Sequence, residues 1–252
     1  MEINFIEIVL LMITGLMAGV INTLAGGGSN LTLPVMMVMG MPADIANATN
    51  RVGIFLQCIV GIAGFHKHKK LDSHDLGPIL WPTLLGGLIG ALFASYAPEF
   101  LLKPLLLGVM LTMTLIILIR PSIIIPSPDS KPKRVADSSQ SWWMLLLAGF
   151  YGGFVQAGVG FILIAALAGS LRYDLVRANA LKLVCSLGFT TVALIIFVIN
   201  NQVLWLPGLI LAVGTMSGAH IAVKFAIRVK ASTLKWFLFI MTLSGSLAAM
   251  IY

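Results

Sequence analysis

Two glycine-rich segments interrupt long uncharged stretches, and their residue types are those that bind anions. "LAGGGSNLTLP" covers residues 24–34 within an uncharged stretch at 8–43, and "QAGVGF" covers 156–161 within another at 138–171. Neighbouring glycines end a helix, and a helix that restarts after them presents free N–H groups and a partial positive charge. Such an N-terminus binds anions. We therefore predict that the two glycine turns form an anion site.

Polar side chains accompany both turns. The residues predicted to bind there are Asn22, Gly26, Gly27, Gly28, Ser29, Asn30, Gln156, Gly158 and Gly160. The alternative is that the glycines only let helices pack closely, as small residues do in membranes. The same feature occurs midway along both stretches, and this repetition favours the binding site.

Two basic residues lie inside apolar segments at matched positions. Arg51 follows "ANATN" and Lys182 follows "ANAL", each about six residues, or ~9 Å, into its segment. Ionisable residues inside spans are costly and indicate function, unless their long side chains reach the nearer interface. Arginine can donate two parallel hydrogen bonds to an oxyanion. The predicted site is completed by Asn47, Thr49, Asn50, Arg51, Asn179 and Lys182.

Signatures of other chemistry are missing from the sequence. It contains no HExxH, GxSxG or Walker A motif, and "AGGGSN" is not set in a βαβ unit. Asp44 and Asp174 directly precede predicted helices and are interpreted as N-caps. Cys58 and Cys185 are predicted to be small buried residues. We expect no enzyme activity, no cofactor and no metal.

The composition indicates that the segments that carry these residues lie in a membrane. Of the 252 residues, 59% are hydrophobic and only 10% are charged, whereas soluble domains average about 25% charged residues. Several apolar stretches approach the ~20 residues that cross a bilayer. The net charge of +7 falls in loops between apolar segments, so a nucleic-acid partner is not expected. The sequence predicts an all-α polytopic membrane protein.

The predicted helical segments form two similar sets. The first set has two arms of about 15 residues within 8–43, then segments at 45–66, 76–96 and 100–119; the second has two arms within 138–171, then segments at 176–199, 205–223 and 232–252. A shift of 132 residues superimposes the glycine turns and the "ANA" motifs. We predict repeat 1 at residues 1–119, a linker at 120–141 and repeat 2 at 142–252.

The basic residues predict how the chain crosses the membrane. Four clusters of Lys and Arg fall on one side if each repeat has five segments, or a re-entrant hairpin plus three spans. That side, with the linker, should be cytoplasmic, and both termini should lie outside. An odd number of segments makes the repeats inverted. The short helices then meet near the midplane, where inverted-repeat transporters bind substrate.

The stretch "GLMAGVINTLAGGGSNLTLPVMMVMGMPADIANATNRVG" resembles the N-terminal signature of the TauE/SafE sulfite exporter family, also called the 4-toluene sulfonate uptake permease family. The second half is similar to its degenerate repeat, although Ala166 stands where the first half has Pro34. The resemblance implies transport of sulfite, thiosulfate or organosulfonates across a bacterial inner membrane. It also implies that other organic acids are candidate substrates.

The expected function is secondary transport, with export favoured, of a small sulfur-containing anion by alternating access around the glycine turns. The alternatives are an anion channel, a carrier of another organic acid and a membrane scaffold. The expected partners are the anion and the lipid bilayer. The sequence leaves open whether the unit is a homodimer.

Overall fold

The computed structural model describes residues 3–71, 76–98, 100–102, 104–106, 108, 112 and 133–228. All the regular structure in these residues is helical, and five helices are long and apolar enough to cross a membrane. The prediction of an all-α polytopic membrane protein is thus confirmed for the described part. The predicted segment at 232–252 lies outside it, as does most of 100–119 and of the linker.

The helices follow the predicted segments closely. They are α1 (Phe5–Leu24), α2 (Ser29–Val38), α3 (Ala43–Lys67), α4 (Leu76–Tyr96), α6 (Ser139–Phe154), α7 (Val159–Ile164), α8 (Leu175–Ile199) and α9 (Trp205–Arg228). A short 3-10 helix, η2 (Val135–Asp137), precedes α6, and a π-helical turn, η3 (Ala165–Ser170), continues α7.

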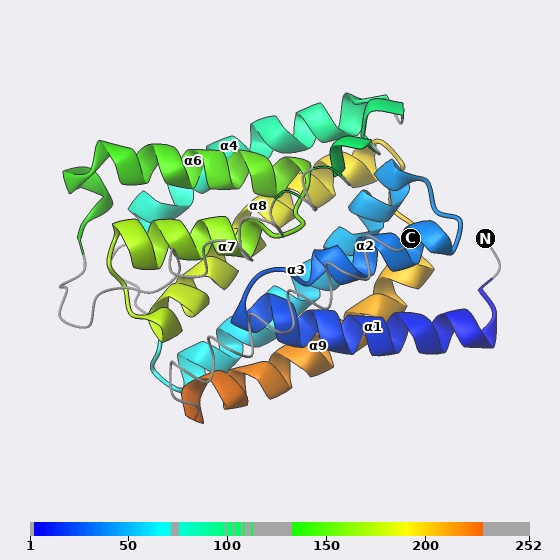
Figure 1. The fold of residues 1–252 in the computed structure, drawn as a ribbon, viewed down its shortest axis with the longest axis horizontal. Coiled ribbons are helices and arrows are strands. Elements are labelled where there is room, and N and C mark those ends of the chain that lie inside the picture. Colours follow the sequence, from blue (N-terminus) through cyan, green and yellow to red (C-terminus); the bar gives the residue numbers. More distant parts are fainter. Residues whose placement is uncertain are drawn as a thin grey trace.

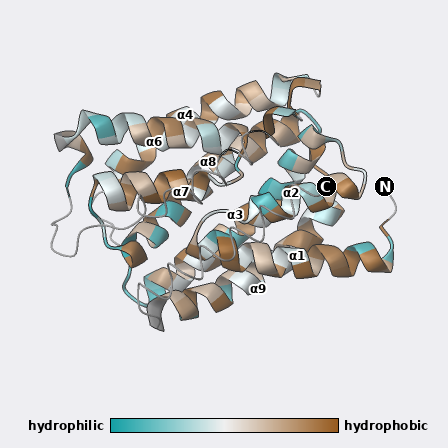
Figure 2. Ribbon diagram, viewed as in Figure 1, coloured by the Kyte–Doolittle hydropathy of each residue, from teal (hydrophilic) through white to brown (hydrophobic). Residues whose placement is uncertain are grey.

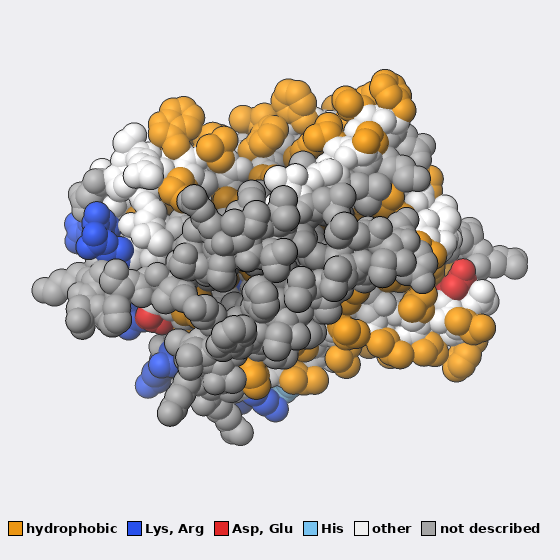
Figure 3. Space-filling view, viewed as in Figure 1, with side chains coloured by type: hydrophobic (Ala, Val, Ile, Leu, Met, Phe, Trp, Pro, Cys, Tyr) orange, Lys and Arg blue, Asp and Glu red, His pale blue; other side chains and the backbone are white. Residues whose placement is uncertain are grey.

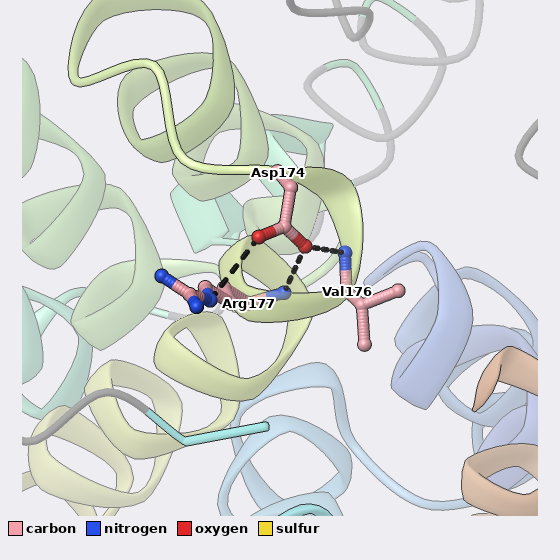
Figure 4. Close-up of polar contacts among 3 residues, drawn as sticks. All are labelled: Asp174, Val176 and Arg177. Carbon is pink, nitrogen blue, oxygen red and sulfur yellow. Dashed lines mark hydrogen bonds and ion pairs between the residues drawn. The ribbon is translucent and has the colours of Figure 1, made fainter. Parts of the chain in front are cut away.

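Side-chain caps fix where two of these helices begin. The Asn4 side chain accepts from the backbone N–H of Glu7, whose carboxylate accepts in turn from the backbone N–H of Asn4, a capping box. Asp174 accepts from the backbone N–H groups of Val176 and Arg177 at the start of α8 (Figure 4). The N-cap prediction is confirmed for Asp174. For Asp44 it is wrong, because α3 begins at Ala43 after Pro42 and Asp44 lies within its first turn.

Each uncharged stretch folds as a hairpin with unequal arms. Gly28 lies against the carbonyl of Ala18, so α2 turns back along α1. Ser141 and Ser170 lie 2.7 Å apart through their hydroxyls, so the chain after α6 returns to the start of that helix. The prediction of equal arms is wrong. α1 has 20 residues and α2 only 10, because α1 already begins at Phe5, before the uncharged stretch, and α2 ends at Val38, shortly before Gly40 with its φ of +88°.

Helices of the first half of the chain pack against helices of the second half. In Figure 1, α4 and α6 form one edge, α1 and α9 form the other, and α3 and α8 cross between them. Small residues make the edge contacts close, as is typical inside membranes. Gly15 and Gly19 of α1 face the α9 backbone, and Gly86 and Gly90 of α4 face that of α6.

The surface matches a protein immersed in lipid. Large apolar side chains such as Phe5, Trp81 and Phe93 are exposed, and Figure 2 shows α1 as mainly hydrophobic. On the face shown in Figure 3, Lys and Arg gather at the end where α6 begins and α9 ends. The predicted clustering of basic residues at one end is visible there.

The close packing of α4 on α6 can be tested by the addition of one methyl group. A Cβ on Gly90 would lie 2.0 Å from the carbonyl oxygen of Phe150, which is backbone and cannot rotate away. We expect Gly90→Ala to lower the stability by about 1–3 kcal/mol, as overpacking does. Thermal unfolding of the detergent-purified protein measures this. Gly77→Ala on the same helix meets nothing within 4 Å and is the control; equal melting temperatures for both variants would contradict the packing.

Candidate anion-binding site

The two glycine turns touch each other at the centre of the molecule. The N–H of Gly160 donates to the carbonyl oxygen of Gly26 at 3.2 Å. A Cβ on either glycine would lie 2.1 Å from the Cα of the other. Gly26 also has a φ of +94°, which favours glycine. No anion fits between these two residues in this conformation, so any bound anion lies beside the contact.

The neighbouring glycines are packed against other parts of the hairpins. A Cβ on Gly27 would meet the Phe161 ring at 2.9 Å, so this side chain of α7 covers the start of α2. A Cβ on Gly28 would lie 2.4 Å from the carbonyl oxygen of Ala18 and 2.8 Å from the Cβ of Asn22, both in α1. Gly158, with a φ of +76°, is the N-cap of α7. Both turns therefore need glycine for backbone geometry and for close approach.

Arg51 is fully buried and bonded to the end of the broken helix α6. Its Nη1 donates to the carbonyl oxygen of Gly152 and to Gln156 Oε1, each at 2.5 Å. Its Nη2 donates to the carbonyl oxygen of Gly153 at 2.8 Å and, more weakly, to Asn47 Oδ1 at 3.4 Å. Asn47 in turn donates to the carbonyl oxygen of Phe154 at 3.0 Å. Interface snorkelling is thus excluded for Arg51.

Lys182 makes the corresponding contacts with the end of α1. This side chain is 1% exposed. Its ammonium donates to the carbonyl oxygens of Asn22 and Thr23, at 2.8 and 3.0 Å, and to Asn179 Oδ1 at 2.8 Å. Asn179 and Asn47 occupy matching places in the two "ANA" motifs. The motif therefore supplies the same construction twice.

Each construction caps a helix that belongs to the other half of the chain. Carbonyl groups in the last turn of a helix lack intrahelical partners and carry a partial negative charge. Arg51 of α3 meets that charge at the end of α6, and Lys182 of α8 meets it at the end of α1. We call these the Arg51 cap and the Lys182 cap. They satisfy the backbone where it breaks inside the bilayer, which lipid cannot do.

Uncharged side chains extend both caps into a polar centre. Asn22 Nδ2 donates to Gln57 Oε1 at 3.3 Å, and Gln57 Nε2 donates to Thr23 Oγ1 at 3.2 Å. Asn50 Nδ2 donates to Ser29 Oγ at 2.9 Å, and Asn50 Oδ1 accepts from Thr32 Oγ1 at 2.7 Å. The first turn of α2 is thus tied to α3.

The polar centre has positive charge and no acidic partner for it. No carboxylate forms an ion pair with Arg51 or Lys182 in the described part of the chain, and the ion pair that is present there, Arg177 with Asp174, lies at the surface. Two buried donors have no hydrogen-bond partner, Arg51 Nε and Asn179 Nδ2, and one buried acceptor, Asn30 Oδ1, is also unpaired. Among the described residues no group of His, Cys, Asp or Glu could hold a metal.

The structure brings most of the predicted residues together. Those joined by the two caps, the glycine contact or the α2–α3 bonds are Asn22, Gly26, Ser29, Asn47, Asn50, Arg51, Gln156, Gly160, Asn179 and Lys182. Thr49 does not join them, because its Oγ1 accepts from the backbone N–H of Leu204 before α9. Cys58 and Cys185 are free and buried, as predicted.

The polar side chains of the centre that are absent from the predicted set are Thr23, Thr32, Gln57 and Thr190. Gln57 bridges Asn22 and Thr23, and Thr190 lies 3.5 Å from Gln156 Oε1. A signal was available in the spacing. Gln57 follows Asn50 by seven residues, and Thr190 follows Lys182 by eight, so each lies on the same face of its helix.

The chain matches known proteins over nearly its whole length. Residues 11–249 match the sequence model of the family described as "Sulfite exporter TauE/SafE". A "Probable membrane transporter protein" of Haemophilus influenzae is 25% identical over 89% of this chain and 87% of its own. "Probable membrane transporter protein ORF9" of Sinorhizobium sp is 23% identical over 96% and 92%, and "Probable membrane transporter protein YfcA" of Escherichia coli is 24% identical over 86% and 80%.

The contact between the turns predicts a difference between two glycines. We expect Gly160→Ala to abolish transport, because its methyl group would overlap backbone atoms of Gly26 and force the turns apart. Gly27→Ala is the matched control, since the nearest atoms to its methyl group belong to the side chains of Phe161 and Ile21, which can adjust, and not to backbone. Solute flux in proteoliposomes, normalised to reconstituted protein, measures both variants. Full activity of Gly160→Ala would show that the contact is not required.

Proposed function

We propose that this membrane transporter, which belongs to the sulfite exporter TauE/SafE family, carries a small sulfur-containing anion such as sulfite or an organosulfonate. The family and the relatives named as probable membrane transporters support transport. The choice of a sulfur anion rests on the family description together with the charge of the polar centre.

One observation carries this proposal: two buried cations lie in the centre, and no carboxylate of the described residues pairs with them. A buried charge is costly unless it is paired, and in membrane proteins such residues mark the path of a substrate. Carbonyl dipoles offset part of the charge of Arg51 and Lys182. An anion that enters the centre supplies the rest of the compensation, and both cations attract it.

The binding site of this proposal lies beside the glycine contact, among the predicted residues. The first turn of α2, after Gly28, supplies backbone N–H groups and a partial positive charge. Ser29, Asn30, Asn50, Gln156 and Asn179 supply polar groups that replace water around the anion. A site lined with donors suits an oxyanion better than a cation.

We propose alternating access between two inverted repeats. α2 and α7 start near the centre and run in opposite directions (Figure 1), as inverted repeats require. Because α1 packs on α9 and α4 packs on α6, the groups that rock would be α1, α3 and α9 against α4, α6 and α8. In this proposal the contact of Gly26 with Gly160 closes the path between the two sides of the membrane.

Export from a bacterial cytoplasm fits the charge of the substrate. An inside-negative potential favours exit of an anion by about 2.3 kcal/mol per charge per 100 mV. The described spans contain no deep acid for a proton relay. We therefore propose either uniport or entry of a proton with the substrate itself. A channel shares the charged centre, and a scaffold protein would need the two cations only as helix caps.

Counterflow separates these alternatives. We expect labelled sulfite to enter proteoliposomes faster when they are preloaded with unlabelled sulfite. Arg51→Ala should reduce this flux by at least ~10-fold, because it removes charge-assisted hydrogen bonds. Preloading with taurine or an organic acid then ranks substrates.

Three other outcomes would each change the proposal. Sulfite flux without stimulation by trans sulfite indicates a channel. Flux of organic acids but of no sulfur anion corrects the substrate class. Absence of flux for every anion, in protein that is folded by thermal unfolding, favours the scaffold.

The orientation of the chain in the membrane can be tested at two turns that occupy corresponding places in the two repeats. Lys69 and Asn201 are exposed, have φ values of +54° and +56°, and follow the ends of α3 and α8. In intact cells, a membrane-impermeant maleimide should label Asn201→Cys, while Lys69→Cys should react only after permeabilisation. The buried native cysteines provide a low background. The reverse labelling pattern would invert the proposed topology.

A further inference from the structure

The two caps look alike but leave different hydrogen-bond donors unused. An ammonium group has three N–H donors, and all three of Lys182 are bonded to protein oxygens at 2.8–3.0 Å. A guanidinium has five, and Arg51 uses four of them. Its Nε–H is buried and has no partner. Arg51 therefore keeps a charged donor available, and Lys182 does not.

The unused donor of Arg51 lies on a useful edge of the group. Nε and Nη2 point to the same side of a planar guanidinium, and this is the edge that holds two oxygens of one anion in parallel. Nη2 binds Asn47 Oδ1 only weakly, at 3.4 Å. An oxyanion that takes the free Nε–H and replaces this weak Nη2 bond therefore leaves the bonds of Nη1 to the Gly152 carbonyl and of Nη2 to the Gly153 carbonyl in place. The Phe197 ring, 5.6 Å from Cζ, holds the plane of the group in place.

The Lys182 cap offers an anion much less. For Lys182 to contact it, the ammonium must release a carbonyl at the end of α1, which would then lie unpaired in the bilayer. The unpaired donor in this cap is Asn179 Nδ2, a neutral amide. A hydrogen bond from a neutral donor to an anion is weaker than one from a guanidinium.

We propose that the transported anion is held by the Nε–Nη2 edge of Arg51, and that Lys182 is a positioning residue that caps α1 without touching the anion. This assignment rests on the proposed function. It gives the two matched cations different roles: one binds the substrate, and the other keeps the glycine turn of α1 in place.

Concentration-dependent sulfite uptake into proteoliposomes tests the assignment through Arg51→Lys and Lys182→Gln. We expect Arg51→Lys to raise KM by about tenfold or more, because lysine keeps the charge but lacks the two-donor edge. Lys182→Gln should lower the maximal rate while KM changes by less than about threefold, because a neutral amide caps the carbonyls more weakly. Lys182→Arg, which restores a charged cap, should recover part of the lost rate.

A binding measurement separates loss of binding from loss of folding. In detergent, sulfite should raise the melting temperature of wild type and of Lys182→Gln, and should leave that of Arg51→Lys unchanged. The melting temperature without sulfite reports folding of each variant. The assignment is overturned if Lys182→Gln raises KM as much as Arg51→Lys, or if Arg51→Lys keeps the wild-type KM. If wild type itself neither transports nor binds any sulfur anion, the proposed function fails instead.

Discussion

The fold depends on one constraint, which is that a helix broken inside a bilayer leaves carbonyl groups that lipid cannot satisfy. The chain meets it with cations from across the molecule, because Arg51 caps α6 and Lys182 caps α1. The caps cross between the halves, so neither hairpin is complete without the other half. The interleaved packing of α1 on α9 and of α6 on α4 has the same effect.

The glycine turns and the caps together hold the ends of α1 and α6 next to each other. Gly26 and Gly160 allow the backbones to touch, and the caps keep the two helix ends on either side of that contact. Replacement of the cations by apolar residues would leave several carbonyls unpaired, and loss of the glycines would separate the turns. A charged centre is thus also the means by which the breaks are stabilised.

Sequence reasoning succeeded where the signal was periodic or repeated. The segments at 76–96 and 176–199 match α4 and α8 closely, and the paired "ANA" motifs place Arg51 and Lys182 at matching positions, each bonded to the Asn of its own motif. It could not show what these cations bind, because their carbonyl partners lie more than 100 residues away in the sequence. Backbone carbonyls carry no signature in a sequence. The meeting of the short helices near the midplane was expected, but the direct bond from the Gly160 N–H to the Gly26 carbonyl was not, because it too is made by backbone groups.

The two halves have kept the caps but have diverged around them. The first turns of α2 present Ser29, Asn30 and Thr32, whereas the corresponding part of α7 presents Phe161, Ile162 and Ile164. Phe161 lies over Gly27, so an apolar side chain of the second half covers the polar turn of the first. The polar groups of this centre therefore come mainly from the first hairpin, and the second hairpin contributes an apolar cover.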